Sequence, residues 1–416
     1  MAGSSGSSAA YDFIIAGAGP GGTTAALVLA GKGLRIALLD KAHFPRDKVC
    51  GDALSGKVIS VLKYAAPEAA AALHQFPQKL GSWGIRFVAP GGEAIDIPFR
   101  SEKAAELPHP PGYISRRTDF DYFLWQQVPD EPGLDRYEGF AVEEVESDAG
   151  AVRVRSGDRW LSGKLLIGAD GAHSRVARYL GGHALDPEHH SGGIRAYYRG
   201  VTGFHEQDFI ELHFLRDLLP GYFWVFPLPG GYANVGLGML TRDLSRTGTN
   251  LKKQLETLVR EHPALAPRFA QAECEGPIRG FGLPLGSKRR PLSGRRILLV
   301  GDAGSLIDPF SGEGIGNAMI SGKIAAEQAL ACLAENDYSD ARLRTYDEAV
   351  WKKIGKELQL SHRMQRLVNY PWLFDFVVRK ANRNEALRTL FTMMFENLDI
   401  RKELSRPGFY WKLLWG

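Results

Sequence analysis

The chain has 416 residues, of which 44% are hydrophobic and 24% charged, with a formal net charge of +4 at pH 7. It can therefore bury a large core, and we expect two interleaved domains. No run of Lys and Arg is long enough to suggest nucleic-acid binding, and no stretch reaches the roughly 18 apolar residues of a membrane span.

The cysteines indicate the compartment. Cys50, Cys274 and Cys332 are odd in number, widely spaced and free of any CxxC pair. This pattern favours a reducing compartment and argues against a structural zinc site, so we expect a cytoplasmic protein without a metal. Residues 1–10 are rich in Gly and Ser and lack an apolar segment, which predicts a flexible tail.

A glycine-rich turn follows the first expected strand, Phe13 to Ala16. The sequence GAGPGG begins at Gly17 and leads into a helix of small residues. In dinucleotide-binding turns the first glycine permits the tight turn, Gly19 lets the backbone approach a pyrophosphate, and Gly22 allows close helix packing. A second strand ends at Asp40, 18 residues after Gly22, where such sites carry an acid for the ribose. The sequence therefore predicts a nucleotide site.

The middle of the chain alternates between helical and strand patterns. We expect a helix from Val58 to Leu73, another after Tyr113, and a third from Leu251 to Val259 inside a β-rich segment, Gly192 to Gly282. After Gly314 the chain is predicted to be mostly helical. Further strands are expected at Trp83 to Val88, Ala94 to Pro98, Ala141 to Glu146, Ala151 to Arg155 and Trp160 to Ile167.

A second strand-turn-helix pattern lies far along the chain from the first. The apolar run before Gly301 leads into Asp302, and Gly312, Gly314 and Gly316 follow. These glycines open a helix whose N-terminus can face a negatively charged group. Two such sites in one chain indicate FAD rather than NAD as the ligand.

The order of the motifs resembles that of the p-hydroxybenzoate-hydroxylase-like flavoproteins. These motifs are GAGPGG at Gly17, Arg-x-x-Phe-Asp at Arg117, Asp-Gly-x-x-Ser at Asp170 and Gly-Asp-Ala at Gly301. Within that superfamily, the segments Phe44 to Asp52 and Pro220 to Pro227, the latter followed by Ala233 to Gly236, resemble the geranylgeranyl reductase family. Its members use reduced FAD to saturate isolated double bonds in prenyl chains.

This resemblance implies an α/β fold built from two interleaved parts. A Rossmann-type FAD-binding domain is expected at residues 11–80, 112–185 and 283–330, and a β-sheet substrate domain at 81–111 and 186–282. A helical C-terminal region is expected at 331–416.

The resemblance also implies roles for single residues. Asp40 would bind the adenosine ribose, Arg117 would lie against the phosphates, and Asp302 would accept a hydrogen bond from the ribityl chain. The alternative for Arg117 is a surface salt bridge, and Asp170 is either a turn organiser or a helix cap. The residues expected to contact the cofactor are Gly17, Gly19, Pro20, Gly22, Asp40, Lys41, Arg46, Cys50, Gly51, Arg117, Asp302, Gly312, Gly314, Ile315 and Gly316.

Three residues are candidates for the chemistry at the flavin. Cys50 lies in a polar loop near Arg46 and Lys48, whose charges would favour a thiolate, and it is either a proton donor or part of the cavity wall. Tyr222 and Trp224 alternate on an expected strand and face the same side. They form either an aromatic wall of an apolar substrate channel or ordinary sheet packing.

The predicted function is hydride transfer from reduced FAD to a C=C bond of an isoprenoid lipid. No second dinucleotide fold is recognisable, so NAD(P)H and ferredoxin both stay open as electron donors. A monooxygenase is the alternative, since it also starts from reduced flavin. A halogenase is disfavoured, because residues 222–227 do not carry Trp-x-Trp-x-Ile-Pro. The aromatic and basic end, Phe409 to Trp415, either contacts a membrane surface peripherally or packs on the protein.

Overall fold

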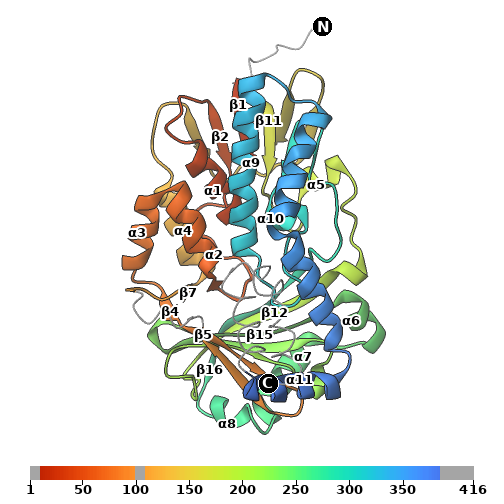
Figure 1. Cartoon of the computed structure of the whole chain (residues 1–416). Helices are drawn as coiled ribbons and strands as arrows, with labels where there is room; N and C mark the ends of the chain where they lie inside the picture. Colours follow the sequence, from red (N-terminus) through yellow and green to blue (C-terminus); the bar gives the residue numbers. More distant parts are fainter. Residues whose placement is uncertain (1–9, 99–107, 385–416) are drawn as a thin grey trace.

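Two β-sheets, one above the other, form the frame of the molecule (Figure 1). This computed structural model describes residues 10–98 and 108–384, so the expected tail at 1–9 and the aromatic end, 409–415, lie outside the described residues. Long helices run beside the upper sheet, and shorter ones lie around the lower sheet (Figure 1).

The upper sheet contains the N-terminal strand at its centre. Its strands, in spatial order, are β17 (Ser293–Gly294), β18 (Ile297–Leu299), β11 (Arg159–Gly168), β1 (Ala10–Ala16), β2 (Ile36–Leu39) and β8 (Leu134–Tyr137), with β10 (Val152–Ser156) and β9 (Glu144–Ser147) attached to β11. The five strands from β18 to β8 are parallel. Their carboxyl ends therefore meet at one edge, where ligands bind in open parallel sheets.

The lower sheet is built from two separate segments of the chain. Its order is β16 (Glu273–Pro284), β12 (His190–Arg199), β15 (Tyr232–Leu240), β14 (Tyr222–Leu228), β13 (Ile210–His213), β5 (Gly84–Val88) and β6 (Ala94–Pro98). Neighbouring strands are antiparallel except for β13 and β5. A small third sheet, β3 (Ala53–Leu54), β7 (Gly112–Ile114) and β4 (Leu80–Ser82), lies between the two.

The helices pack mainly on the upper sheet. They are α1 (Pro20–Leu29), α2 (Gly56–Ala65), α3 (Pro67–Gln75), α4 (Arg117–Gln127), α5 (Arg175–Leu180), α6 (Thr241–Thr247), α7 (Leu251–Glu261), α8 (Ala266–Phe269), α9 (Ile315–Glu335), α10 (Asp340–Leu367) and α11 (Pro371–Arg383). Helices α1 and α9 touch closely, because a Cβ at Gly322 would lie 2.1 Å from the Gly21 carbonyl oxygen. None of the described helices is both long and apolar enough to cross a bilayer.

The prediction of a single helix from Val58 to Leu73 is wrong in one respect. Two helices, α2 and α3, cover this segment, and Ala66 between them has φ −156° and ψ 84°. The following Pro67 disfavours the α conformation at Ala66 by steric clash, so the helix ends there.

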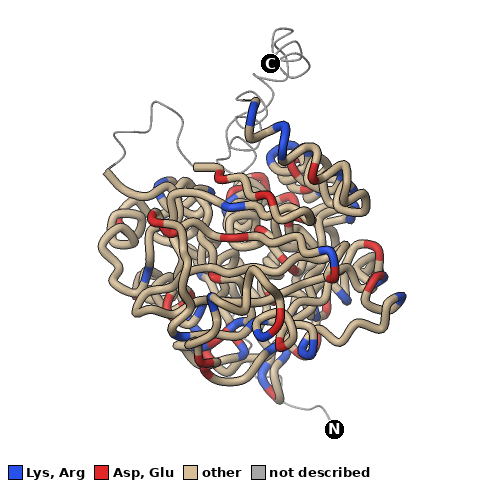
Figure 2. Tube along the Cα trace, turned by 90° about the horizontal axis from the view of Figure 1, so that it is seen from below, with Lys and Arg blue, Asp and Glu red and all other residues tan. Residues whose placement is uncertain are grey.

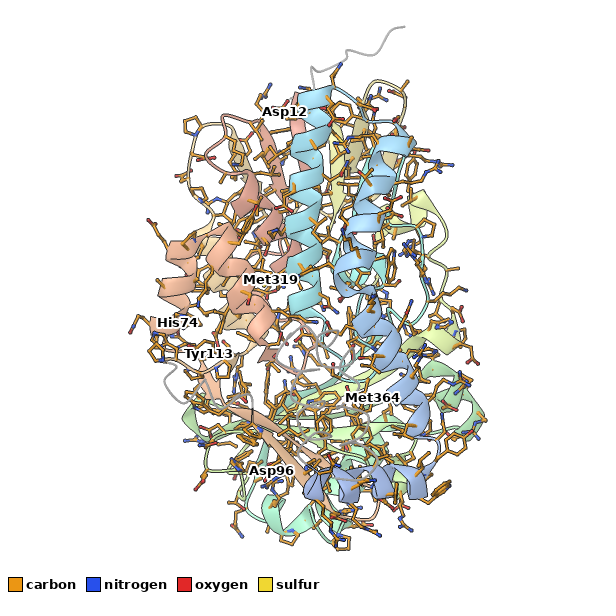
Figure 3. The ribbon with its side chains drawn as sticks, viewed as in Figure 1. Asp12, His74, Asp96, Tyr113, Met319 and Met364 are labelled. Carbon is orange, nitrogen blue, oxygen red and sulfur yellow. The ribbon has the colours of Figure 1, made fainter. Side chains whose placement is uncertain are left out.

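Helix α10 joins the two halves of the molecule. Met319 of α9 lies in the core of the upper half, whereas Met364 near the end of α10 packs against the core of the lower half (Figure 3). The proposed domain boundary between residues 330 and 331 falls inside α9. We propose that the upper sheet belongs to the FAD-binding domain and the lower sheet to the substrate domain.

Candidate functional site

One large cavity lies between the two sheets, at the carboxyl ends of the parallel strands. Its volume is about 720 Å³, and both sheets contribute to its wall. Most of the predicted residues line it: Gly17, Gly19, Pro20, Asp40, Lys41, Arg46, Cys50, Gly51, Arg117, Tyr222, Trp224, Asp302, Gly312, Gly314 and Ile315. Residues far apart in sequence are thus brought to one place.

Two predicted contact residues, Gly22 and Gly316, do not line the cavity. A Cβ at Gly22 would lie 1.8 Å from the Gly17 carbonyl oxygen, and a Cβ at Gly316 would lie 2.6 Å from the Cβ of Lys57. Their lack of a side chain lets helices α1 and α9 pack against neighbouring backbone and side chains.

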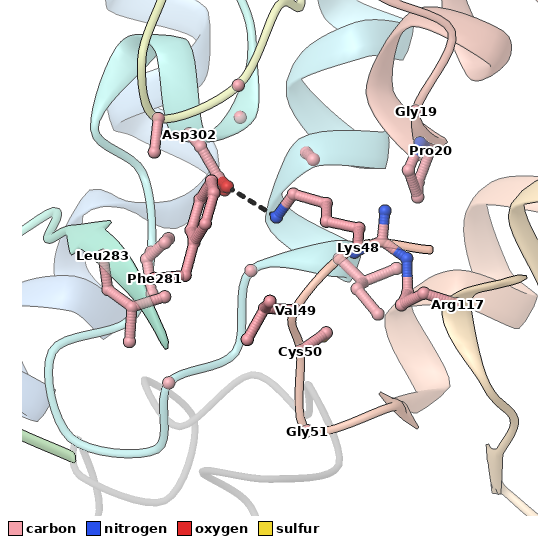
Figure 4. Close-up of a pocket in the computed structure, with 18 of the residues that line it drawn as sticks. Gly19, Pro20, Lys48, Val49, Cys50, Gly51, Arg117, Phe281, Leu283 and Asp302 are labelled. Atoms are coloured by element: carbon pink, nitrogen blue, oxygen red, sulfur yellow. Dashed lines mark hydrogen bonds and ion pairs between the residues drawn. The ribbon is translucent and has the colours of Figure 1, made fainter. Parts of the chain in front are cut away.

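Gly19 differs from the glycines around it. A Cβ at Gly19 would meet only Arg46 Nη2 at 3.7 Å and Arg117 Nη2 at 4.0 Å, so it faces two guanidinium groups across open space. Pro20 begins α1, so the free N–H groups of this helix lie at the end that Gly19 and Pro20 form, near Arg117 (Figure 4). Backbone donors, a positive helix end and two arginines around open space fit a pyrophosphate.

Two arginines and two carboxylates form a network beside this space. Arg46 bonds Asp40 at 3.2 Å and Asp121 at 2.8 Å, and Arg117 bonds Asp121 through Nε at 2.6 Å and Nη2 at 2.7 Å. Arg117 is buried, with 3% of its side chain exposed, so its surface salt-bridge alternative is wrong. Burial lowers the pKa of Arg117, but Asp121 and Cys50 more than offset this and the net pKa is raised. Arg117 therefore keeps its positive charge.

The predicted ribose ligand Asp40 is well ordered by its neighbours. One carboxylate oxygen accepts the Ala18 N–H at 3.1 Å, and the other accepts the Ala42 N–H at 2.9 Å. Asp170 accepts hydrogen bonds from Ser174 Oγ at 2.5 Å and the Arg175 N–H at 2.7 Å, so it supports the turn before α5, whose N-cap is Ser174.

The second glycine site brings a partner for Asp302 that sequence reasoning missed. Lys48 Nζ donates to Asp302 Oδ2 at 3.1 Å (Figure 4). At the start of α9, the Gly316 N–H donates to the Glu313 carboxylate at 2.7 Å. No local sequence signal pairs Lys48 with Asp302, because 254 positions separate them.

The surroundings of Cys50 differ from the expectation. Arg46 bonds Asp40 and Asp121, and Lys48 bonds Asp302. The cation that interacts with the Cys50 thiol is Arg117. The Cys50 carbonyl accepts a hydrogen bond from Asn234 Nδ2 at 2.7 Å. The loop position of Cys50 is therefore fixed through its backbone.

A buried hydrogen-bond network joins this loop to the lower sheet. Asp52 is fully buried and accepts bonds from Asn234 Nδ2 and the Tyr197 hydroxyl, both at 2.8 Å. Asn234 in turn accepts from Trp224 Nε1 at 2.8 Å. Burial raises the pKa of Asp52 to about 6, although Asn234, Tyr197 and two arginines act in the opposite direction. Both residues belong to segments that carry the family resemblance, but neither of them was assigned a role from the sequence.

One part of the floor of the cavity is apolar. Tyr222, Trp224 and Phe226 follow one another on the same face of β14, with ring centroids 6.1 and 6.4 Å apart, and Leu212 and Ile85 extend this surface. The Tyr222 hydroxyl donates to the Ser311 carbonyl at 3.3 Å, which ties the floor to the loop before α9.

The family profile of the FAD binding domain matches residues 10–356. The chain belongs to this FAD-binding family. It is 27% identical over 354 residues to the digeranylgeranylglycerophospholipid reductase of Thermoplasma acidophilum, covering 83% of this chain and 85% of the relative. It is 29% identical over 409 residues to the menaquinone reductase of Mycobacterium tuberculosis, covering 93% and 91%.

Solved structures agree with these sequence relatives. A geranylgeranyl bacteriochlorophyll reductase-like protein from Thermoplasma acidophilum superposes with a TM-score of 0.76 at 25% identity, covering 89% of this chain and 91% of that one. A flavin-dependent brominase gives 0.75 at 20% identity over 93% of each chain, which shows a shared fold.

This FAD-binding protein is therefore a FAD-dependent oxidoreductase that is similar to geranylgeranyl-type reductases. The predicted family, α/β fold and FAD cofactor are confirmed. The roles of single residues stay predictions. When bound and reduced, FAD would supply a hydride, and the residues that line the cavity would hold the cofactor.

Proposed function

We propose that this flavoenzyme saturates C=C bonds of a prenyl lipid. The observation that carries the proposal is the composition of the cavity. Its upper wall holds the glycines, arginines and Asp302 expected to bind FAD, and its floor is the aromatic and aliphatic surface around Trp224. A hydrocarbon chain has few hydrogen-bonding groups, so it is bound through burial of its apolar surface and through complementary shape.

The test is anaerobic turnover. Reduced enzyme under argon is mixed with a geranylgeranyl lipid, and the masses of the products are measured by mass spectrometry. Saturation adds about two mass units per double bond, because one hydride and one proton enter each bond. A product that gains oxygen from ¹⁸O₂ would instead support hydroxylation, the second candidate, which starts from the same reduced flavin.

The electron donor is part of this proposal. We infer NAD(P)H or reduced ferredoxin, and the two are distinguished by which one bleaches the flavin without oxygen. Neither requires a second dinucleotide fold if the contact is transient.

We also propose that α11 contacts an anionic membrane, from which a lipid substrate would be collected. Trp372 and Phe376, four residues apart on this helix, are 70% and 53% exposed. The same helix ends in Arg379, Lys380 and Arg383. Figure 2 shows blue Lys and Arg segments near the end of the described chain. Aromatic residues and cations on one exposed helix suit a bilayer surface with negative lipids.

A further inference from the structure

One row of residues crosses the floor of the cavity and changes in polarity along its length. The register places Arg279 of β16 opposite Arg195 of β12, Arg195 opposite Gly236 of β15, Gly236 opposite Trp224 of β14, and Trp224 opposite Leu212 of β13. Directly opposite residues point to the same face of a sheet. The row therefore starts with two cations and ends in apolar side chains.

Gly236 does not leave a gap in the surface that this row of residues forms. A Cβ at Gly236 would lie 2.3 Å from Trp224 Cζ2, so the indole covers this position. Arg279, Arg195, Trp224 and Leu212 all line the cavity. The cationic end and the apolar end thus belong to one continuous surface.

The two arginines share a single carboxylate. Arg195 Nη2 donates to both oxygens of Asp47, at 2.8 and 3.0 Å, and Arg279 Nη1 donates to Asp47 Oδ2 at 3.3 Å. One positive charge in this cluster is therefore left without a carboxylate inside it.

Arg195 also has an unused donor. Its side chain is 3% exposed, and its Nε is buried without a hydrogen-bond partner. The guanidinium lies 4.0 Å from the centroid of the Tyr197 ring, which restricts its orientation. A buried donor without a partner is unfavourable, so the protein neighbours of Arg195 leave part of its hydrogen-bonding capacity unused.

The cofactor phosphates do not account for this cluster. Arg46 and Arg117 already face Gly19 and are held by Asp40 and Asp121 on the upper half of the molecule. Arg195 and Arg279 come from strands of the lower sheet, beside the apolar floor.

We infer that Arg195 and Arg279 bind a phosphate or diphosphate group at the head of the substrate, whose hydrocarbon chain then lies across Trp224 toward Leu212. The inference rests on the proposed function and deepens it. Such a subsite selects prenyl lipids with an anionic head over neutral ones such as prenyl alcohols and quinones. Guanidinium groups suit this role, because their planar donors pair with phosphate oxygens in charge-assisted hydrogen bonds.

The test uses the FAD-loaded enzyme and compares two probes of equal chain length, geranylgeranyl phosphate and geranylgeraniol. Binding is measured by isothermal titration, so it does not depend on turnover. Arg279→Gln is the main variant, because Arg279 is 52% exposed and its loss leaves Arg195 paired with Asp47. Arg199→Gln is the matched control, since Arg199 ends β12, the strand that carries Arg195, and does not line the cavity.

We expect Arg279→Gln to weaken binding of geranylgeranyl phosphate by about tenfold and to leave binding of geranylgeraniol unchanged. Arg199→Gln leaves both unchanged. Arg195→Lys keeps the charge but loses the planar donors, and it also weakens the phosphate probe selectively. Inorganic pyrophosphate competes with geranylgeranyl phosphate in the wild type. Equal affinity of wild type and Arg279→Gln for the phosphate probe would overturn the inference.

NADPH provides the second arm, because it also carries phosphates. If Arg279→Gln weakens NADPH binding and leaves geranylgeranyl phosphate unaffected, the subsite belongs to the reductant and the inference is wrong. Failure of the proposed function has a different signature: no prenyl compound gains two mass units, while phosphate-dependent binding through Arg279 persists.

Discussion

Lys48 and Asp302 form a 3.1 Å ion pair between two walls of the cavity, with 24% and 12% of their side chains exposed. If Asp302 accepts a hydrogen bond from the ribityl chain, Lys48 competes with the cofactor for the same carboxylate. We therefore expect Lys48→Met to tighten FAD binding several-fold and Asp302→Ala to weaken it by about 1.5–3 kcal/mol, the range for a hydrogen bond to a charged group. Fluorescence titration of the FAD-free protein measures both.

Lys323→Met serves as the control for this pair. Lys323 bonds Glu327 within α9, and it does not line the cavity. Its loss should leave FAD affinity unchanged. If Lys48→Met weakened FAD binding as much as Asp302→Ala, Lys48 would be a cofactor ligand rather than a competitor.

Gly19 and Gly22 should respond differently to the same substitution. Gly19→Val places a side chain in open space between Arg46 and Arg117, so the protein should fold while losing FAD. Gly22→Val collides with the Gly17 carbonyl, so the fold itself should fail. Circular dichroism and the flavin absorbance of purified protein separate the two effects. A folded Gly19→Val protein with full flavin content would show that the pyrophosphate does not bind at this turn.

Much of the site was predictable because its motifs are local. Gly17, Gly19 and Asp40 are recognised from a strand, a turn and a spacing that a few dozen residues define, and the Asp121 partner of Arg117 is one helical turn away. The Ala66 break was also readable, since Pro67 follows it.

The remaining contacts depend on tertiary structure. Arg195 and Asp47 are 148 positions apart, and Asn234 reaches Asp52 across 182 positions. Neither residue type nor spacing marks these pairs, because they meet only after the lower sheet has formed beneath the loop that carries Cys50. The interactions expected for Cys50 differ for the same reason. Arg46 and Lys48 are close to Cys50 in sequence, but they bond carboxylates elsewhere.

Asp52 should make stability depend on pH. Its folded-state pKa of about 6 lies above the ordinary value of 3.8. The native state therefore binds the proton more tightly, so the contribution of Asp52 to stability is full below about pH 4 and is lost as the pH rises through 6. We expect the unfolding free energy of the wild type to fall, relative to that of Asp52→Asn, between pH 4 and 6, as measured by urea denaturation.

Asparagine suits the left-handed φ of +68° at this position, which limits backbone strain in the variant. Asp158→Asn, on an exposed turn, is the control and should show no such change. A constant difference between wild type and Asp52→Asn across this pH range would contradict the buried titration.

The α11 surface should bind vesicles that contain phosphatidylglycerol. Replacing both Trp372 and Phe376 by Ser removes the exposed aromatic groups, and we expect at least a roughly tenfold loss of binding in a sedimentation assay. High salt should weaken binding of the wild type, because the cations on α11 act electrostatically. Leu185→Ser is the control, since Leu185 is 64% exposed and lies elsewhere on the surface. Equal binding by the double variant would leave α11 without this role.

Cys50 is the candidate proton donor for the carbon next to the one that accepts hydride. Its thiol lies beside Arg117 and lines the cavity, while its backbone carbonyl is held by Asn234. Replacing the side chain should therefore leave the loop and FAD binding intact. We expect Cys50→Ala to slow reoxidation of reduced flavin by a prenyl substrate by roughly 10²-fold, the usual lower range for a lost general acid, and Cys50→Ser to lose less.

Anaerobic stopped-flow absorbance measures this step, and Cys274→Ala, at an exposed cysteine, is the control. Full-speed reoxidation in Cys50→Ala would assign the proton to solvent and leave Cys50 as part of the cavity wall.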